Sequence, residues 1–349
     1  MESQDIVEWG RPLQKRIREA PPQPRGTQVL VRVSHCGVCH SDVHVQEGFF
    51  DLGGGNKLNF VGRLPLPVTP GHEIVGTVLA AGEAAQGVTL GAQVLVNPWV
   101  GCGQCALCRD DHDNLCAKGL ALGIQLPGGF ATHVLAPHPK YLHAIDGLDP
   151  ALAAPLACSG VSTYSAAKKL LPIGADDWVA VIGCGGLGLA AISALRALGH
   201  ARILACDVDG AKLQAAQAWG AQATCDIRED GARRILAAAG GPLYGMLDFV
   251  GLTTTFELAA PTLRKGGRYV VCGLMGGLGS VSVVMLALRE HSLMGSYVGS
   301  PRDLRELVAL AQAGKLKMGN VTTRPLGEAQ AALQDLVQGK VVGRQVLLA

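Results

Sequence analysis

The second half of the chain alternates two kinds of hydrophobic pattern, and this alternation limits the folds that the chain can adopt. Short continuous apolar runs, typical of buried strands, are separated by stretches whose apolar residues recur at helical spacing. The apolar runs are 178–182, 202–206, 247–250 and 269–272, and the helical stretches are 187–198, 211–219 and 254–263. Strands that alternate with helices over such a length form βαβ units around a parallel sheet. This half therefore predicts a doubly wound α/β domain.

The first half shows short alternating runs that are broken by glycine and proline. Segment 49–66, with its three consecutive glycines, has no period of its own and is expected to be a loop. The other expected strands are 29–33, 74–79, 93–96 and 345–348, and the expected helices of the tail are 304–313 and 328–337. We therefore predict a mostly β domain over 1–159, completed by 295–349, and the doubly wound domain over 160–294.

A glycine-rich hexapeptide, 183–188, joins the first strand of the doubly wound domain to its first helix. Its sequence, Gly-Cys-Gly-Gly-Leu-Gly, matches the G-x-G-x-x-G pattern that lets the backbone approach a pyrophosphate at a helix N-terminus. Asp207 follows the next strand, 19 residues after Gly188, where a carboxylate accepts from a ribose 2′-hydroxyl and repels a 2′-phosphate. The pattern predicts binding of NAD(H) in preference to NADP(H). The predicted contacts are Gly183, Gly185, Gly186, Leu187, Gly188 and Asp207.

Four cysteines cluster in one short segment, at Cys102, Cys105, Cys108 and Cys116. Four thiolates at this spacing suit a tetrahedral zinc site that has no open position, so the cluster predicts a structural metal site. An iron–sulfur cluster is the alternative, although nothing else in the sequence implies electron transfer.

A second group of potential metal ligands is spread along the chain. Cys39 lies in segment 33–44, which contains thiols, imidazoles, hydroxyls and a carboxylate. A hydrophobic core does not need such a mixture of polar groups. His72 and Cys158, each taken alone, are more often satisfied core residues than ligands. Joined to Cys39, they form the Cys₂His set of a catalytic zinc, with one position left for water or substrate. Cys36 suggests a local C-x₂-C pair with Cys39, but we expect it to be a buried thiol.

The composition argues against several classes of protein. A net charge of +2 over 349 residues gives no long-range electrostatic reason to bind nucleic acid or an anionic membrane. No apolar run reaches transmembrane length, and the N-terminus lacks the basic start and apolar centre of a signal peptide. We therefore expect a cytoplasmic protein, in which 11 cysteines indicate metal sites and buried thiols instead of disulfides.

Together these motifs resemble those of the zinc-dependent medium-chain alcohol dehydrogenases, in particular the NAD-dependent bacterial and yeast type. The resemblance covers almost the whole chain, and the motifs occur in the family's order. They are Cys39-His40-Ser41-Asp42, Gly71-His72-Glu73, the four-cysteine cluster, Cys158, the glycine fingerprint and Gly343-Arg344. The resemblance implies a GroES-like catalytic domain, a Rossmann coenzyme domain, an active site in the cleft between them, NAD(H), and one catalytic and one structural Zn²⁺ in each chain.

The family's roles carry over to individual residues of this sequence. Cys39, His72 and Cys158 resemble the ligands of the catalytic zinc. Asp42 resembles the carboxylate that orients the histidine ligand, and Glu73 resembles the carboxylate that approaches the metal during ligand exchange.

Proton transfer and coenzyme contacts follow from the same resemblance. Ser41 resembles the hydroxyl that takes the substrate's proton, and His44 resembles the imidazole that passes it through the nicotinamide ribose toward solvent. Trp99 is a candidate wall of the substrate pocket. Three basic residues resemble contacts to the coenzyme's phosphates or adenosine ribose, with solvated surface charges as the alternative. They are His40, Lys212 and Arg344.

The resemblance implies reversible oxidation of primary or secondary alcohols to aldehydes or ketones. Ser41 leaves more room beside the metal than a threonine would, which favours bulky or aromatic substrates. A polyol, sugar or amino-acid dehydrogenase is the alternative within this fold, and a non-catalytic zinc- and nucleotide-binding sensor is the alternative outside it. The family also implies a homotetramer, or else a homodimer. Segment 49–66 makes the chain longer than the usual member by roughly a dozen residues beside the substrate cleft, so we expect it to affect substrate size and access.

Overall fold

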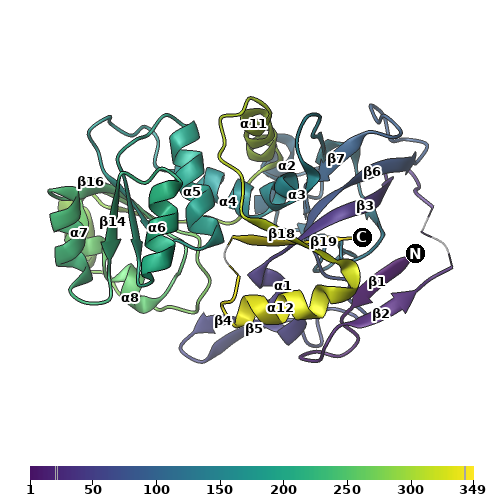
Figure 1. Ribbon diagram of the computed structural model, residues 1–349, viewed down its shortest axis with the longest axis horizontal. Helices are drawn as coiled ribbons and strands as arrows, with labels where there is room; N and C mark the ends of the chain where they lie inside the picture. The colour runs from purple at the N-terminus through teal and green to yellow at the C-terminus, as the bar shows by residue number, and fades with distance from the viewer. Residues whose placement is uncertain (20, 22, 342) are drawn as a thin grey trace.

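Two sheets organise the molecule, one in each half (Figure 1). The computed structural model describes residues 1–19, 21, 23–341 and 343–349. The teal and green half, at left in Figure 1, comes from the middle of the chain, and the purple and blue half comes from the N-terminal part. The yellow C-terminal segment returns to the N-terminal half, so both ends of the chain lie there. Among the described residues, no helix is long and apolar enough to span a membrane.

The teal and green half is built on a six-stranded sheet with the order β14-β13-β12-β15-β16-β17, in which every pairing is parallel. Its strands are β12 (Val179–Ile182), β13 (Ile203–Asp207), β14 (Ala223–Asp226), β15 (Leu243–Asp248), β16 (Leu263–Val271) and β17 (Ser292–Gly295). Its helices are α5 (Gly186–Ala197), α6 (Gly210–Ala218), α7 (Gly231–Ala239), α8 (Thr253–Phe256), α9 (Ala259–Thr262) and α10 (Val283–Arg289). The predicted doubly wound domain is confirmed. The strand order reverses between β12 and β15, and ligands bind beyond the carboxyl ends of strands at such a point.

Local sequence explains why the first predicted helix of this half is present and why the last one is wrong. All four residues of β12 are buried, and α5 buries Leu189, Ile192 and Leu195 in the same core. The single helix predicted over 254–263 is wrong, because the chain forms two short helices, α8 and α9, before β16 begins. Pro261 lies within α9 and lacks the N–H that a longer helix would need.

The purple and blue half is built on a seven-stranded sheet with the order β11-β7-β6-β3-β19-β18, and β10 also pairs with β3. Its strands are β3 (Val29–Val38), β6 (Glu73–Ala81), β7 (Gln93–Val96), β10 (His133–Ala136), β11 (Leu142–Ala144), β18 (Val321–Pro325) and β19 (Arg344–Leu348). Because β19 pairs antiparallel with β3, the tail belongs to the sheet of the N-terminal half. The domain boundaries at 159 and 294 stay a prediction.

The remaining helices surround this sheet or lie between the two halves. The α-helices are α1 (His40–Glu47), α2 (Ala106–Arg109), α3 (Pro150–Ala153), α4 (Ser159–Lys168), α11 (Pro301–Gln312) and α12 (Ala329–Val337). The 3₁₀ helices are η1 (Asp113–Leu115), η2 (Pro139–Tyr141), η3 (Ala154–Ala157) and η4 (Leu326–Glu328). Helix α4 packs against both α5 and α11, and it thereby connects the two halves.

Three small antiparallel pairs complete the fold, and one of them corrects a prediction. They are β1 (Glu2–Asp5) with β2 (Gln14–Ile17), β4 (Phe49–Gly53) with β5 (Asn56–Asn59), and β8 (Trp99–Val100) with β9 (Leu120–Ala121). The expectation that 49–66 is a loop throughout is wrong, since β4 and β5 form a hairpin. All four residues of β5 are exposed, so the strand has no buried face to produce an alternating pattern in the sequence.

Candidate metal centres and coenzyme site

Three potential metal ligands that are far apart in the sequence converge on one buried point. Cys39 lies at the N-cap of α1, His72 immediately precedes β6, and Cys158 lies between η3 and α4. Their ligand atoms all lie within 4.8 Å of one another, and the sulfurs of Cys39 and Cys158 are 3.9 Å apart. Two thiolates on a tetrahedral zinc ion are about 3.8 Å apart, because each Zn–S bond is about 2.3 Å long. The spacing therefore fits Zn²⁺.

The hydrogen bonding of His72 also fits a metal ligand. Its Nδ1 lies 3.1 Å from Oδ1 of Asp42, whereas its buried Nε2 has no hydrogen-bond partner among the described residues. A buried ring nitrogen without a partner is costly unless it binds a metal. A carboxylate on Nδ1 fixes the tautomer that leaves the lone pair of Nε2 free for coordination. The donor set of two sulfurs and one nitrogen leaves a fourth position open.

Asp42 organises the backbone around these ligands. The side chain is fully buried, and its Oδ2 accepts a hydrogen bond from the backbone N–H of Cys39 at 2.9 Å. Its Oδ1 accepts from the backbone N–H of Gly71 at 3.0 Å in addition to facing His72. One carboxylate thus holds two of the three ligand-bearing segments, as the sequence predicted for an orienting group.

Glu73 and Arg344 form an ion pair next to the metal donors. Glu73, the first residue of β6, is fully buried and pairs with the guanidinium of Arg344 from β19. Burial raises the pKa of Glu73 to about 7, although the charge of Arg344 opposes the shift. The second oxygen, Oε2, has no partner in the described part of the chain. Arg344 also reaches the glycine fingerprint, since a Cβ at Gly186 would lie 3.1 Å from its Cδ.

The four clustered cysteines form a second group of converging ligands. The ligand atoms of Cys102, Cys105, Cys108 and Cys116 all lie within 4.8 Å of one another. The sulfur–sulfur distances include 3.4 Å from Cys105 to Cys108 and 3.9 Å from Cys105 to Cys116. Hydrogen bonds from the backbone N–H groups of Gln104 and Cys105 lower the pKa of Cys102 to about 6, which favours the thiolate that binds metals. Four sulfur donors fit a closed tetrahedral zinc site.

Helix α1 presents the candidate proton-transfer residues beside the first group. Ser41 and His44 are three positions apart and therefore lie on the same side of the helix. The His44 ring packs against Phe50 with the ring centroids 5.0 Å apart, and its Nδ1 lies 3.6 Å from Oε2 of Glu47. His40 begins the helix and is exposed to solvent.

The glycine fingerprint forms a tight turn between β12 and α5. Gly183 has φ +86°, a conformation that side chains rarely adopt, and a Cβ there would lie 2.6 Å from the side chain of Val250. A Cβ at Gly188 would lie 1.9 Å from the carbonyl oxygen of Gly183. Only glycine permits this close packing, which leaves the N-terminus of α5 open for a pyrophosphate.

Asp207 stands at the carboxyl end of β13, as a ribose-binding carboxylate must. Its Oδ2 accepts from the backbone N–H of Cys184 at 2.7 Å, and its Oδ1 accepts from those of Val208 and Asp209 at 2.7 and 3.0 Å. The carboxylate is therefore fixed against the fingerprint. Lys212 lies in the first turn of α6, and its side chain is exposed. Among the described residues, Lys212 makes no hydrogen bond to Asp207.

Two aromatic side chains lie next to His72. The Trp99 ring is 5.7 Å from the His72 ring, centroid to centroid, and Tyr297 packs on Trp99 edge to face at 5.9 Å. The backbone carbonyl of Tyr297 accepts from Nδ2 of Asn114 at 3.0 Å, which fixes it to the four-cysteine segment. The sequence prediction included Trp99 but missed Tyr297. Its position just after β17, at the carboxyl end of a parallel strand, was the available signal.

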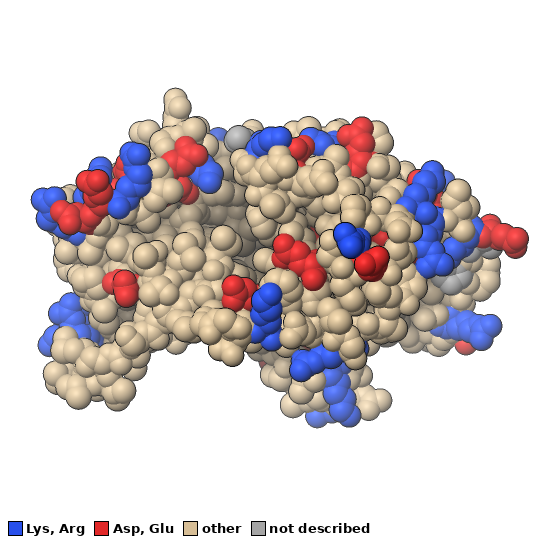
Figure 2. Space-filling view, turned by 90° about the horizontal axis from the view of Figure 1, so that it is seen from below, with Lys and Arg blue, Asp and Glu red and all other residues tan. Residues whose placement is uncertain are grey.

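The surface between the two halves is hollowed. Figure 2 shows this on the face seen from below, where acidic and basic side chains are interspersed and form no continuous patch. A cavity of about 770 Å³ lies between the four-cysteine segment, α4 and the carboxyl ends of β16 and β17. Tyr297 and Ser296 line it, together with Lys169, whose Nζ donates to the Ser296 hydroxyl at 2.9 Å.

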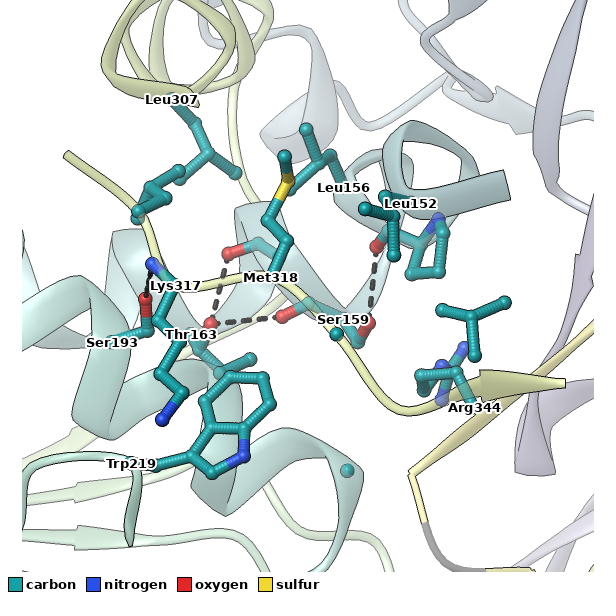
Figure 3. A pocket seen from close by; sticks show the side chains of 17 residues that line it. Leu152, Leu156, Ser159, Thr163, Ser193, Trp219, Leu307, Lys317, Met318 and Arg344 are labelled. Carbon is teal, nitrogen blue, oxygen red and sulfur yellow. Dashed lines mark hydrogen bonds between the residues drawn. The ribbon is translucent and has the colours of Figure 1, made fainter. Parts of the chain in front are cut away.

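A second cavity, of about 70 Å³, lies among α4, α5 and segment 316–321, and Arg344 also lines it (Figure 3). Two of its hydroxyl groups have partners within the protein: Thr163 donates to the carbonyl of Ser159, and the Ser193 hydroxyl accepts from the N–H of Lys317. The rest of the lining is largely apolar, with Leu152, Leu156, Leu307, Met318 and Trp219 around it. Nothing in this lining supports acid–base or metal chemistry.

Comparison with known proteins yields one family for the whole chain. Residues 25–146 match the alcohol dehydrogenase GroES-like domain, and residues 186–313 match the zinc-binding dehydrogenase family. The NAD-dependent alcohol dehydrogenase of Sulfurisphaera tokodaii is 38% identical over 356 residues, which covers 100% of both chains.

Solved structures agree with the sequence comparison. The alcohol dehydrogenase of Aeropyrum pernix is 30% identical with a TM-score of 0.88, and the match covers 100% of both chains. The D-arabinose dehydrogenase of Sulfolobus solfataricus is 27% identical with a TM-score of 0.84, over 100% of this chain and 99% of that one. The fold of the two halves is thus that of known dehydrogenases.

Metal content tests both groups of ligands. We expect the purified protein to contain about two zinc ions per chain, and the Cys39→Ala and Cys105→Ala variants to contain about one each, because each change removes one donor from one site. Inductively coupled plasma mass spectrometry measures this. Cys36→Ala is the matched control, since Cys36 is a buried thiol three residues from Cys39, and it should keep both ions. Two ions retained in Cys39→Ala would contradict the first site.

Proposed function

The chain belongs to the family of zinc-dependent medium-chain alcohol dehydrogenases, and we propose that it oxidises primary or secondary alcohols to aldehydes or ketones with NAD, and catalyses the reverse reaction. The observation that carries this proposal is the convergence of Cys39, His72 and Cys158 at 4.8 Å or less, within reach of the coenzyme fingerprint through Arg344. Zn²⁺ held by these three ligands would lower the pKa of the substrate hydroxyl, and NAD would accept the hydride.

The residues around the donors hold the reactants and move the proton. Asp42 fixes the ring of His72 so that Nε2 faces the ligand position. We assign Ser41 to take the proton from the substrate hydroxyl and His44 to pass it toward solvent. The side chain of His44 is 21% exposed, so its proton can leave to water. Glu73, whose pKa is raised to about 7 by burial, can approach the open side of the site during ligand exchange.

The coenzyme site combines the fingerprint with charged residues from both halves. We assign Asp207 to the adenosine ribose, where its fixed carboxylate would repel the 2′-phosphate of NADP. Gly183, Gly185, Gly186, Leu187 and Gly188 would carry the pyrophosphate at the start of α5. His40, Lys212 and Arg344 would supply the positive charges around it.

The side chains near His72 favour apolar substrates. Trp99 and Tyr297 offer aromatic walls beside the metal donors, which suits bulky or aromatic alcohols. The likeness to a D-arabinose dehydrogenase keeps a sugar substrate as the second candidate.

The four-cysteine site would hold the structural zinc. We propose that 1–159 and 295–349 form the catalytic domain, and that 160–294 form the coenzyme domain.

The protein is proposed to be a homotetramer built from dimers. Strand β17 is the outermost strand of the six-stranded sheet, and such an edge is a template for pairing with another strand. Next to it, α10 has no buried residue and exposes Val283, Val284 and Leu288 to solvent. Antiparallel pairing of β17 with its copy around a two-fold axis would extend the sheet and cover α10.

With all 11 cysteines free, the cytoplasm is the proposed location.

Turnover tests the proposed activity. Protein with NAD and a panel of primary, secondary and aromatic alcohols should produce NADH, measured as absorbance at about 340 nm, the band of the reduced nicotinamide. Ser41→Ala should lower kcat by about 10²-fold or more, because proton transfer by a positioned group contributes that much, and it should keep its zinc. Arabinose as the preferred substrate would favour the sugar alternative. Coenzyme binding without turnover of any alcohol or sugar would favour the sensor alternative.

Oligomeric state tests the proposed interface. Leu288→Glu should shift the protein toward monomers, because it places a charge in the apolar surface of α10, and light scattering after size-exclusion chromatography measures the mass. Leu90→Glu is the matched control, since Leu90 is 64% exposed and Leu288 is 65% exposed. An unchanged mass in Leu288→Glu would contradict this interface.

A further inference from the structure

The hairpin β4–β5 is an isolated piece of sheet that needs support from its surroundings. It pairs with no other strand among the described residues. Two strands alone are marginally stable in water, so the contacts at the base and the tip decide where the hairpin lies. Figure 1 shows the hairpin at the lower edge of the molecule, between the two halves.

The base of the hairpin is attached to the helix that carries the proposed proton-transfer residues. The Phe50 ring packs against His44 with the centroids 5.0 Å apart, and against Phe60 edge to face at 5.5 Å. Phe60 is buried in the core of the catalytic half, and its N–H donates to the carbonyl of Gly48 at 2.7 Å. The base is therefore packed against both α1 and the core of the catalytic half.

The tip of the hairpin touches the other half of the molecule. Gly53 is buried, although its neighbours in the turn are exposed, and a Cβ there would lie 2.6 Å from the carbonyl oxygen of Gly276. A Cβ at Gly54 would lie 3.0 Å from Cδ1 of Leu278. On the opposite side, a Cβ at Gly276 would lie 3.0 Å from Cγ of Asp51. Two glycine-rich backbones thus meet at van der Waals distance.

The loop that receives the tip is part of the coenzyme-binding half. The N–H of Gly277 donates to the carbonyl of Gly251 at 2.9 Å, and the N–H of Leu278 donates to Oγ1 of Thr253 at 3.0 Å. The same 250–253 segment packs on the fingerprint, because Val250 fills the space where a Cβ of Gly183 would be. A continuous set of contacts therefore runs from His44 through the hairpin to the pyrophosphate turn.

We propose that hairpin β4–β5 is a strap that fastens the catalytic half to the coenzyme-binding half and thereby sets how fast NADH leaves. This inference rests on the proposed function, because the proposed function places the coenzyme between the two halves. In this proposal the halves separate when the coenzyme exchanges, and the tip contact with 276–278 opposes that separation. Release of product coenzyme limits turnover in many enzymes, so a strap of this kind affects kcat as well.

Two alanine variants of the same turn separate the tip contact from backbone strain. Gly53 has φ +82° and Gly55 has φ +81°, so alanine is equally strained at both positions. The Cβ of Gly53→Ala would collide with Gly276, whereas the Cβ of Gly55→Ala would have nothing within 4 Å. We expect NADH to dissociate about tenfold faster from Gly53→Ala than from Gly55→Ala, because loss of a contact acts chiefly on the dissociation rate. Stopped-flow fluorescence during displacement of NADH by excess NAD measures both rates.

A third variant tests the contact from the other half. Leu278→Ala leaves the hairpin sequence intact, removes the side chain that packs on Gly54, and should also release NADH faster. The double variant Gly53→Ala/Leu278→Ala should be no faster than the faster single variant, since both changes break one contact. Hydrogen exchange of the 276–278 amides, without coenzyme, should increase in the variants that break the contact and stay unchanged in Gly55→Ala.

Each outcome decides the proposal. Equal dissociation rates for Gly53→Ala and Gly55→Ala, or an unchanged rate in Leu278→Ala, overturn the strap and leave the proposed dehydrogenase intact if the unaltered protein still oxidises alcohols. Failure of the unaltered protein to bind NADH overturns the strap and the proposed function together. If Gly53→Ala does not fold, as judged by circular dichroism and zinc content, the rate for Leu278→Ala decides.

Discussion

The candidate active site depends on the buried carboxylate of Asp42, which contacts both Cys39 and His72. These two metal donors are 33 positions apart in the sequence. A carboxylate in a dry interior is costly unless hydrogen bonds satisfy it, and hydrogen bonds to charged groups contribute about 1.5–3 kcal/mol each. Asp42 has such bonds from two backbone N–H groups as well as its contact with the imidazole of His72. The same interactions that make the charge tolerable also fix the positions of two metal donors. The hydrogen bonds of Asp42 therefore both stabilise its buried charge and set the geometry of the metal donors.

The C-terminal tail completes the site from the opposite direction. Gly343 has φ +92°, and a Cβ there would lie 2.0 Å from the carbonyl oxygen of Asn320, so the chain can enter β19 only with glycine at this position. Arg344 follows directly and reaches both Glu73 and the fingerprint. Because β19 pairs with β3, the strand that leads to Cys39, the tail places a cation next to the metal donors and the coenzyme turn at once. The site therefore combines residues of the seven-stranded sheet, which includes β19 of the tail, with the glycine fingerprint that follows β12 of the six-stranded sheet.

Local sequence patterns predicted the parts of this structure that depend on local physics. The fingerprint lies between a buried strand and an amphipathic helix, and the four cysteines are close in sequence, so both could be found from spacing alone. The convergence of His72 and Cys158 on Cys39 could not be found from spacing, because their separation in sequence gives no sign of contact. The Cys₂His donor set and the resemblance to a family suggested it. The pairing of Glu73 with Arg344, which are 271 positions apart, was not predicted, because nothing in the sequence signals this contact. The hairpin β4–β5 had no apolar period to reveal it, because all four residues of β5 are exposed.

The central claim is that Cys39, His72 and Cys158 hold one zinc ion and the four clustered cysteines hold another. X-ray absorption spectroscopy at the zinc edge measures the average ligand shell directly. Four sulfur donors at one site and two at the other predict an average of about three sulfur neighbours per zinc at about 2.3 Å, with nitrogen or oxygen completing only the shell that contains His72. An average of about four sulfur neighbours per zinc would contradict the claim, because it would place all bound zinc in the four-cysteine site.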